Sequence, residues 1–158
     1  MIFGNPYLFS IRFDVVKDWT VPGDTWKTGV LDICVGGDLA YIGLDALELK
    51  TSLGTFVGMG EVIENEVFGD PDLSAKDFYF RSRKYWFDDG EAVRGAVDLT
   101  CTSMQDKGGM LIFMKCEKFD RLVWTNDKGV SVFERHLPLG TVINVLNEIP
   151  DMDVIFES

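Results

Sequence analysis

The chain has 158 residues, a length that fits one domain spanning residues 1–158 around one hydrophobic core. Its 26 acidic residues outnumber its 15 basic residues and give a formal net charge of −11 at pH 7. Nucleic acid and membrane surfaces are therefore disfavoured as partners, because binding to phosphate groups requires a basic surface. The same charge favours solubility, or attraction to a basic macromolecule.

The sequence shows no targeting signal, and its cysteines have the pattern of free thiols, so we expect a cytoplasmic protein. No apolar run approaches the roughly 18–20 residues that span a bilayer, and residues 1–10 place no basic residue before an apolar stretch. Cys34, Cys101 and Cys116 are odd in number and widely spaced within strand-like apolar runs, a pattern typical of unpaired cysteines. We therefore expect a reducing compartment, most simply the cytoplasm.

Alternating apolar and polar side chains predict strands in the first part of the chain. Residues 7–16 place aromatic and aliphatic side chains on one parity and polar side chains on the other, as a half-buried strand does. Residues 30–35 form the second predicted strand. The turn Gly36-Gly37-Asp38 then leads back into a short third strand at residues 39–42.

The middle of the chain is harder to assign. The spacing in residues 45–53 suits a short helix capped by Asp45, although a strand remains the alternative. The glycine-rich and acidic stretch 54–72 is interpreted as strand or loop with one solvated face. The sequence from Ser74 to Asp77 resembles a capping box and predicts a helix through residues 78–86. The aromatic residues in that segment leave a strand as the competing interpretation.

The second half of the chain is again rich in strand patterns. The strands predicted there are residues 96–102, 110–119, 121–125 and 130–136, joined by turns at residues 106–109 and 126–129. Pro138 opens a predicted helix that Pro150 ends, and residues 151–158 are predicted to add an edge strand.

Because these strands follow one another without alternating with helices, the fold class is predicted as α+β. We expect a single domain with a mainly antiparallel meander sheet, a C-terminal helix and one or two other short helices.

The sequence contains no recognisable set of catalytic, metal-binding or cofactor-binding residues. His136 is the single histidine, and it cannot form the usual zinc site of several histidine or cysteine ligands. The glycines between residues 54 and 60 lack the spacing of a phosphate-binding loop, and the calcium-loop spacing of carboxylates is absent. We therefore expect no catalysis, no metal and no cofactor.

Two groups of side chains are candidates for binding another protein. The first is a set of carboxylates that we expect to be exposed: Glu61, Glu64, Glu66, Asp70 and Asp72. The second lies in the aromatic and basic segment 78–87, and its candidates are Tyr79, Arg83 and Trp86. The favoured interpretation of that segment is a core element with basic residues on its solvated face. The alternative is a binding patch, since Tyr, Trp and Arg concentrate in interface hot spots.

The N-terminal region resembles a family of bacterial immunity proteins from polymorphic toxin systems, similar to immunity protein 42. Three features of residues 1–40 carry the resemblance: the opening Met1-Ile2-Phe3-Gly4-Asn5-Pro6, the following strand with its turn Trp26-Lys27-Thr28-Gly29-Val30, and the Gly36-Gly37 hairpin. Members of that family typically begin with MIFG followed by Asn or Asp and then Pro. The resemblance implies a cytoplasmic protein without catalytic activity that binds and neutralises a cognate toxin domain.

Under this hypothesis the mechanism is stoichiometric occlusion of the toxin, with a basic toxin attracted by the acidic chain. Two other hypotheses stay open. The chain would be a small enzyme or ligand-binding domain if carboxylates with perturbed pKa values converged in a cleft between sheet and helices. It would be a self-assembling module if Val154-Ile155-Phe156 paired across a dimer. Both a monomer and a homodimer are therefore compatible with the sequence.

Overall fold

The computed structural model describes residues 1–156, except for the side chains of residues 44–47. Its strands form two antiparallel sheets with the orders β1-β2-β3-β4 and β5-β6-β7-β8. The strands of the first sheet are β1 (Ile2–Asn5), β2 (Phe9–Val15), β3 (Thr28–Val35) and β4 (Asp38–Glu48). Those of the second sheet are β5 (Ala96–Asp98), β6 (Met110–Lys115), β7 (Phe119–Thr125) and β8 (Phe133–Pro138). The α+β class and the antiparallel meander are confirmed, with two sheets in place of one.

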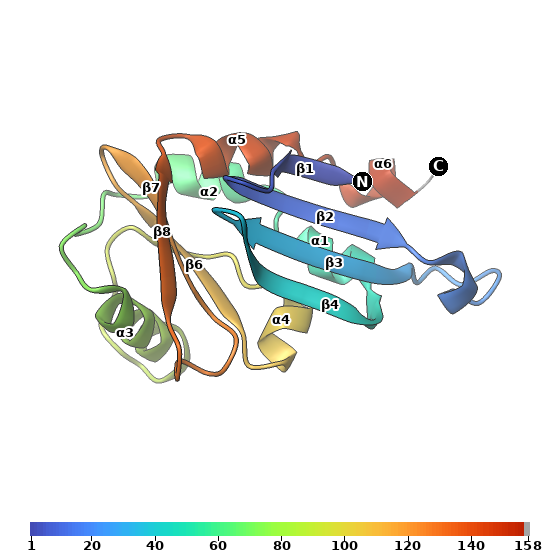
Figure 1. Cartoon of the computed structure of the whole chain (residues 1–158), viewed down its shortest axis with the longest axis horizontal. Coiled ribbons are helices and arrows are strands. Elements are labelled where there is room, and N and C mark those ends of the chain that lie inside the picture. The colour runs from blue at the N-terminus through green and yellow to red at the C-terminus, as the bar shows by residue number, and fades with distance from the viewer. Residues whose placement is uncertain (157–158) are drawn as a thin grey trace.

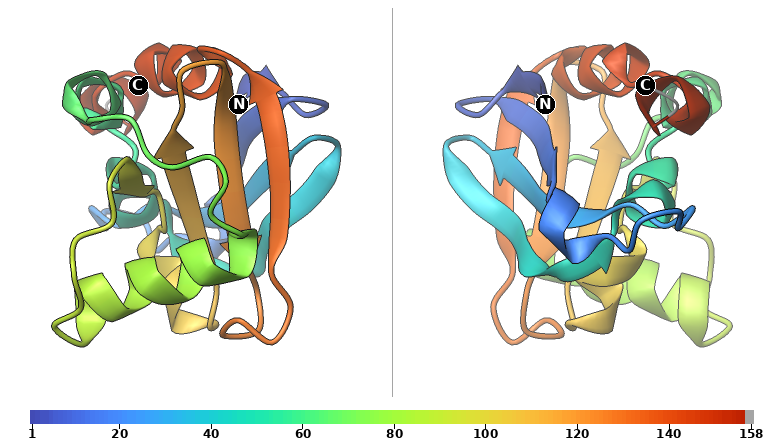
Figure 2. Two further views of the ribbon diagram at one scale, coloured as in Figure 1. Left: turned by 90° about the vertical axis from the view of Figure 1, so that its left-hand side faces the viewer. Right: turned by 90° about the vertical axis from the view of Figure 1, so that its right-hand side faces the viewer.

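Short helices surround the two sheets. They are η1 (Lys17–Trp19), α1 (Leu49–Gly54), α2 (Met59–Asn65), α3 (Ala75–Phe87), α4 (Thr102–Asp106), α5 (Thr141–Glu148) and α6 (Met152–Phe156). Figure 1 shows α2, α5 and α6 along one side of the molecule and α3 at the opposite side. Figure 2 shows α3 crossing the outer face of the second sheet. Among the described residues, no helix is long and apolar enough to cross a bilayer.

One hydrophobic core is shared by the two sheets. Ile11 and Ile33 of the first sheet belong to the same buried cluster as Leu111 and Leu122 of the second. The other face of the second sheet is covered by α3, and the side chains between them form a separate buried cluster. Because the strand β6 is buried on both faces of the second sheet, it is apolar almost throughout, without the alternation seen in β2.

The start of α5 is held by a carboxylate from the second sheet. Asp120 in β7 accepts hydrogen bonds from the backbone N–H groups of Gly140 (3.1 Å) and Val142 (2.8 Å). The residue is only 4% exposed, and burial raises the pKa of its carboxyl although the two hydrogen bonds oppose this shift. Asp120 thereby satisfies N–H groups that the first turn of a helix cannot pair internally.

The sequence-based element assignments hold best where a local signal is strong. The predicted helix after Ser74 is present as α3, and the Ser74 hydroxyl accepts a hydrogen bond from the N–H of Asp77 at 3.1 Å. The turn before β8 contains Gly129 with a φ of +88°, the left-handed conformation expected of a glycine there.

The assignments fail in the middle of the chain. The helix predicted for residues 45–53 begins only at Leu49, because β4 continues to Glu48 and the Glu48 carboxylate accepts the N–H groups of Lys50 and Thr51. The side chain of Asp45, the predicted cap, lies outside the described residues. The stretch 54–72, interpreted as strand or loop, contains the helix α2.

Several assignments in the second half are also corrected. The predicted strand 96–102 ends at Asp98, after which α4 precedes the turn to β6, and the predicted strand 110–119 is broken between Lys115 and Phe119. The strand predicted for residues 130–136 is β8, displaced toward the C-terminus. Pro138 closes this strand, and α5 begins after Gly140, whose φ is +89°.

The predicted edge strand at residues 151–158 is wrong over its described part, because residues 152–156 form α6. Residues 157 and 158 lie outside the described part of the chain. This tail packs against the core, where the ring centroid of Phe156 lies 6.0 Å from that of Phe13. The strand that would pair across a dimer is therefore absent from residues 151–156.

We predict that Asp120→Ala lowers the free energy of unfolding by about 2 kcal/mol, because it leaves the N–H groups of Gly140 and Val142 without their acceptor in a buried place. Asp70→Ala is the matched control. The Asp70 carboxylate also accepts a backbone N–H, from Asp72 at 2.9 Å, but in an exposed turn, so its loss should cost less than about 0.5 kcal/mol. Urea denaturation followed by circular dichroism measures both values, and equal losses would contradict the role given to Asp120.

Candidate functional site

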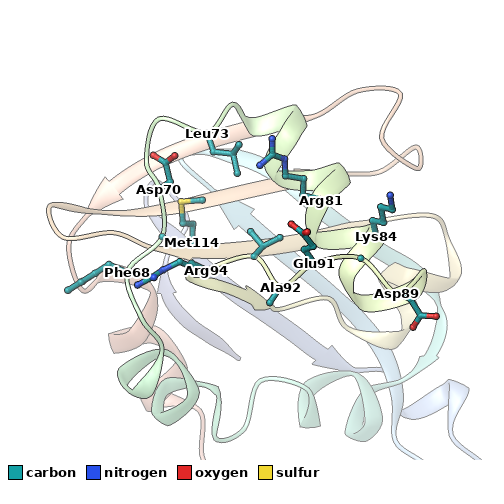
Figure 3. A pocket seen from close by; sticks show the side chains of 13 residues that line it. Phe68, Asp70, Leu73, Arg81, Lys84, Asp89, Glu91, Ala92, Arg94 and Met114 are labelled. Carbon is teal, nitrogen blue, oxygen red and sulfur yellow. The ribbon is translucent and has the colours of Figure 1, made fainter.

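A groove of about 680 Å³ lies between α3 and the two segments that flank it in sequence. Figure 3 shows its walls, with Phe68 and Leu73 coming from the segment before α3 and Glu91 and Arg94 from the segment after it. Met114 of β6 also lines the groove. The groove is only partly enclosed and stays accessible to solvent.

Three cations line this groove in an acidic protein. Arg81 and Lys84 come from α3, and Arg94 comes from the segment before β5, with its side chain directed toward Phe68. Within the described residues, none of the three forms an ion pair. Asp89 and Glu91 line the same groove, so its charge is mixed. Side chains without internal partners are available to bind groups of opposite charge on a partner.

The acidic candidates divide into two groups. Glu61 and Glu64 lie exposed on α2, and their carboxylates form no hydrogen bond or ion pair within the described part of the chain. Glu66, Asp70 and Asp72 follow in the segment that runs from α2 to α3 (Figure 2). The Glu66 carboxylate accepts the N–H of Val67 at 3.0 Å, and Asp70 that of Asp72, so both also shape the local backbone.

The fold adds further carboxylates to those of α2. The helices α2 and α5 are in contact, and a Cβ atom placed on Gly60 would lie 2.0 Å from Oδ1 of Asn147. We define the acidic patch as the exposed carboxylates of α2, of the end of α5, of the link to α6 and of α6 itself: Glu61, Glu64, Glu148, Asp151 and Asp153. Sequence reasoning missed the last three, because they lie more than 80 positions from Glu61 and Glu64 in the chain and only tertiary contacts of α5 with α2 and of α6 with α1 place them on the surface of the fold.

The candidates on α3 have different surroundings. Tyr79 is only 2% exposed and packs in the cluster beneath α3, and Trp86 is partly buried against the same cluster. Arg83 is exposed. The segment is therefore a core element on the face that carries Phe78 and Tyr79, with basic residues on its solvated face, and the binding-patch interpretation of that solvated face stays a prediction. The aromatic rings that α3 does expose are those of Phe80, Tyr85 and Phe87, and the helical period of residues 78–87 could have distinguished them from the buried rings.

The profile of the family described as Immunity protein 42 matches residues 1–152 of the chain. The chain belongs to this family. A crystal structure of CdiI from Burkholderia dolosa AUO158 has a similar fold, with a TM-score of 0.76 and 22% sequence identity over 100% of both chains. No curated protein sequence matches the chain.

Membership of the Immunity protein 42 family establishes toxin neutralisation as the function, and it implies that the chain binds a cognate toxin. The family resemblance seen in residues 1–40 thus extends over almost the whole chain, although the match does not test the opening motif itself.

This immunity protein has a second cleft, of about 320 Å³, which is also lined by α3 but by other residues than the groove. We call it the α3 cleft, and its polar lining includes Tyr79, Arg83, Asp98, Thr100 and Lys128. Burial raises the pKa of the Asp98 carboxyl, although the hydroxyl and the N–H of Thr100, the latter at 3.0 Å, oppose this shift.

Hydrolysis by carboxylates would require a second carboxyl group facing Asp98 across the α3 cleft, and the described lining holds Asp98 alone. Asp120, which also has a raised pKa, is engaged with the backbone of α5. His136 lies exposed on β8, stacked on Phe119 at 4.2 Å. No group of three or more metal-ligating side chains was found within the described residues.

We predict that Asp98→Asn makes the protein more stable at pH 7. The folded-state pKa of Asp98 is raised above its unfolded value, so ionisation destabilises the folded chain as the pH rises from about 4 through the folded pKa. Asparagine keeps an oxygen that accepts the N–H of Thr100 and carries no charge. Urea denaturation at pH 7 and at pH 4 should show that the gain in the free energy of unfolding is smaller at pH 4. The control Asp18→Asn, at an exposed position, should change the free energy of unfolding little at either pH. An equal loss of stability at both pH values would contradict the prediction.

Proposed function

We propose that this immunity protein neutralises its cognate toxin by stoichiometric occlusion, covering the active site of the toxin or a surface beside it. The protein would act in the cytoplasm, without catalysis and without a cofactor. The observation that carries the proposal is the acidic patch, where the carboxylates of Glu61 and Glu64 are exposed and have no partner among the described residues. The free state of Cys34, Cys101 and Cys116 supports a reducing compartment.

The partner surface that we propose runs from α2 to α3. It includes Glu61, Glu64, Glu66, Asp70 and Asp72, followed by Arg83 and Trp86. Tyr79 takes part only through the edge that it presents to the α3 cleft, because its ring is buried. The surface combines exposed charge with the exposed rings of Phe80 and Phe87. Aromatic and arginine side chains at the centre of such surfaces provide most of the binding free energy.

Charge supports a basic toxin as the partner. The chain carries a net charge of −11, and the acidic patch has Lys50 as its one ion-paired cation, joined to Asp153 at 3.1 Å. Opposite charge accelerates the encounter of two proteins, whereas the off-rate depends on close contacts. If the toxin is a nuclease, the carboxylates of α2 would occupy the place of substrate phosphates. The chain would bind the toxin either as a monomer or as a homodimer.

The proposal is tested by capture of the toxin from the native bacterium. The protein is immobilised as bait at low salt, and the proteins that remain after a moderate salt wash are identified by mass spectrometry. We expect one toxin-like protein at near-equal stoichiometry, and co-expression of the chain should restore growth of cells that produce this toxin. A captured toxin that stays fully active in the presence of excess chain would overturn the proposal.

We predict that the double variant Glu61→Lys/Glu64→Lys lowers the association rate constant for the captured toxin about tenfold at low salt, and flattens its dependence on ionic strength. Both residues are exposed without internal partners, so the fold should persist. The matched control is Asp18→Lys/Asp106→Lys, which changes the net charge equally at exposed positions outside α2. Stopped-flow association measures all three proteins. Equal rates for the two double variants would show that the acidic patch does not guide binding.

A further inference from the structure

Two cations of the α3 cleft have no ion-pair partner within the described residues. Arg83 extends from α3 on one side, and Lys128 lies in the turn between β7 and β8 on the other. The carboxyl of Asp98 is the one acidic group of the described lining. The cleft is therefore a local excess of positive charge in a chain whose net charge is −11.

The backbone holds Lys128 in an unusual conformation at the edge of the cleft. Its φ is +56°, in the left-handed region that disfavours side chains larger than glycine or asparagine. The N–H of Lys128 donates a hydrogen bond to the carbonyl of Gly108 at 2.9 Å. A Cβ atom placed on Gly108 would lie 3.0 Å from Cγ of Lys128, so the aliphatic stem of the lysine passes directly over this glycine. A lysine at such a position lowers the stability of the fold relative to glycine, and it places an ammonium group at the edge of the cleft.

Arg83 and Tyr79 lie close enough to interact electrostatically. Burial raises the pKa of Tyr79, and the positive charge of Arg83 opposes this shift. The phenol is therefore a hydrogen-bond donor at neutral pH. The nearby carboxylate of Asp127 also raises the pKa of Tyr79, but Asp127 accepts hydrogen bonds from the Thr125 hydroxyl and the Ser131 N–H, each at 2.8 Å. Asp127 thus stabilises its own turn, and within the described residues no ion pair joins it to Arg83.

We propose that the α3 cleft receives a single carboxylate side chain, from a glutamate or aspartate of the cognate toxin, between Arg83 and Lys128. This inference rests on the proposed function. A planar guanidinium binds a carboxylate through two parallel hydrogen bonds, and the lysine adds a second charge. A volume of about 320 Å³ accommodates one side chain, and Phe87 and Met110 supply apolar contacts for its methylene groups.

A carboxylate fits the cleft better than a phosphate group does. The Asp98 carboxyl also lines the cleft and would repel a dianion more strongly than a monoanion. A protein fits better than a free metabolite, because the exposed rings of Phe80 and Phe87 lie on the same helix as Arg83. These rings would contact the protein surface around the inserted side chain, as aromatic residues do at interface centres.

The test compares Lys128→Gly and Arg83→Gln with the wild-type chain in binding to the captured toxin. Glycine removes the ammonium group and suits the left-handed backbone, so Lys128→Gly should fold at least as stably as wild type. We expect each variant to weaken toxin binding at least about tenfold, with less than additive losses in the double variant. Lys17→Gln, an exposed cation of η1 that lines neither the groove nor the α3 cleft, is the control and should bind within about twofold of wild type.

A second measurement needs no toxin and so separates this inference from the proposed function. Acetate and inorganic phosphate are titrated separately into the isotope-labelled chain, and amide NMR shifts around residues 83, 108 and 128 are followed. Acetate should shift these signals saturably in the wild type and not in Lys128→Gly. Tighter binding of phosphate than of acetate would overturn the carboxylate assignment. Toxin binding that Lys128→Gly and Arg83→Gln leave unchanged would overturn the inference and leave the immunity function intact.

Discussion

The carboxylate of Asp120 fixes the first turn of α5, and the placement of the acidic patch depends on this contact. From its capped N-terminus, α5 directs Val142, Val145 and Leu146 into the core shared by both sheets. The helix α2 then packs against α5, where Gly60 permits a close approach to Asn147. The carboxylates of α2 and the one at the end of α5 thereby become neighbours although about 85 positions separate them in the chain. The buried carboxylate of Asp120 thus helps to position the exposed carboxylates of the acidic patch. We propose that the protein binds its toxin through these exposed carboxylates.

The helix α3 combines a structural role with the proposed binding role because its two faces differ. Its buried face, with Phe78 and Tyr79, covers the outer face of the second sheet. Its solvated face carries cations into the groove on one side and into the α3 cleft on the other. Among the described residues, two non-glycine residues have a left-handed backbone: Asp89, which lines the groove, and Lys128, which lines the α3 cleft. Backbone strain of this kind persists where the surrounding structure fixes it, and it is enriched at functional sites.

Local signals in the sequence were sufficient for some elements and not for others. The alternation in residues 7–16 and the Ser74 cap identify β2 and α3, because each depends on interactions within a few residues. The division into two sheets could not be predicted, since it depends on which apolar faces meet across the core. The tail 151–156 is helical because it packs against α1 and Phe13, contacts that no local pattern records. For the same reason the acidic residues of α2 were found as candidates, whereas Glu148, Asp151 and Asp153 were not.

A uniformly acidic surface would attract any basic protein, and attraction of that kind cannot distinguish one toxin from another. The charge of this chain is not uniform, because unpaired cations gather beside α3 while the carboxylates of the acidic patch lie on α2, α5 and α6. On the proposed mode of binding, the cognate toxin is basic where it faces the acidic patch and presents a carboxylate where it faces Arg83 and Lys128. A toxin without that carboxylate would be drawn to the chain equally fast, but docking would desolvate two cations without pairing them. The penalty would appear in the dissociation rate. The acidic patch would therefore set the speed of capture and the α3 cleft the choice of toxin.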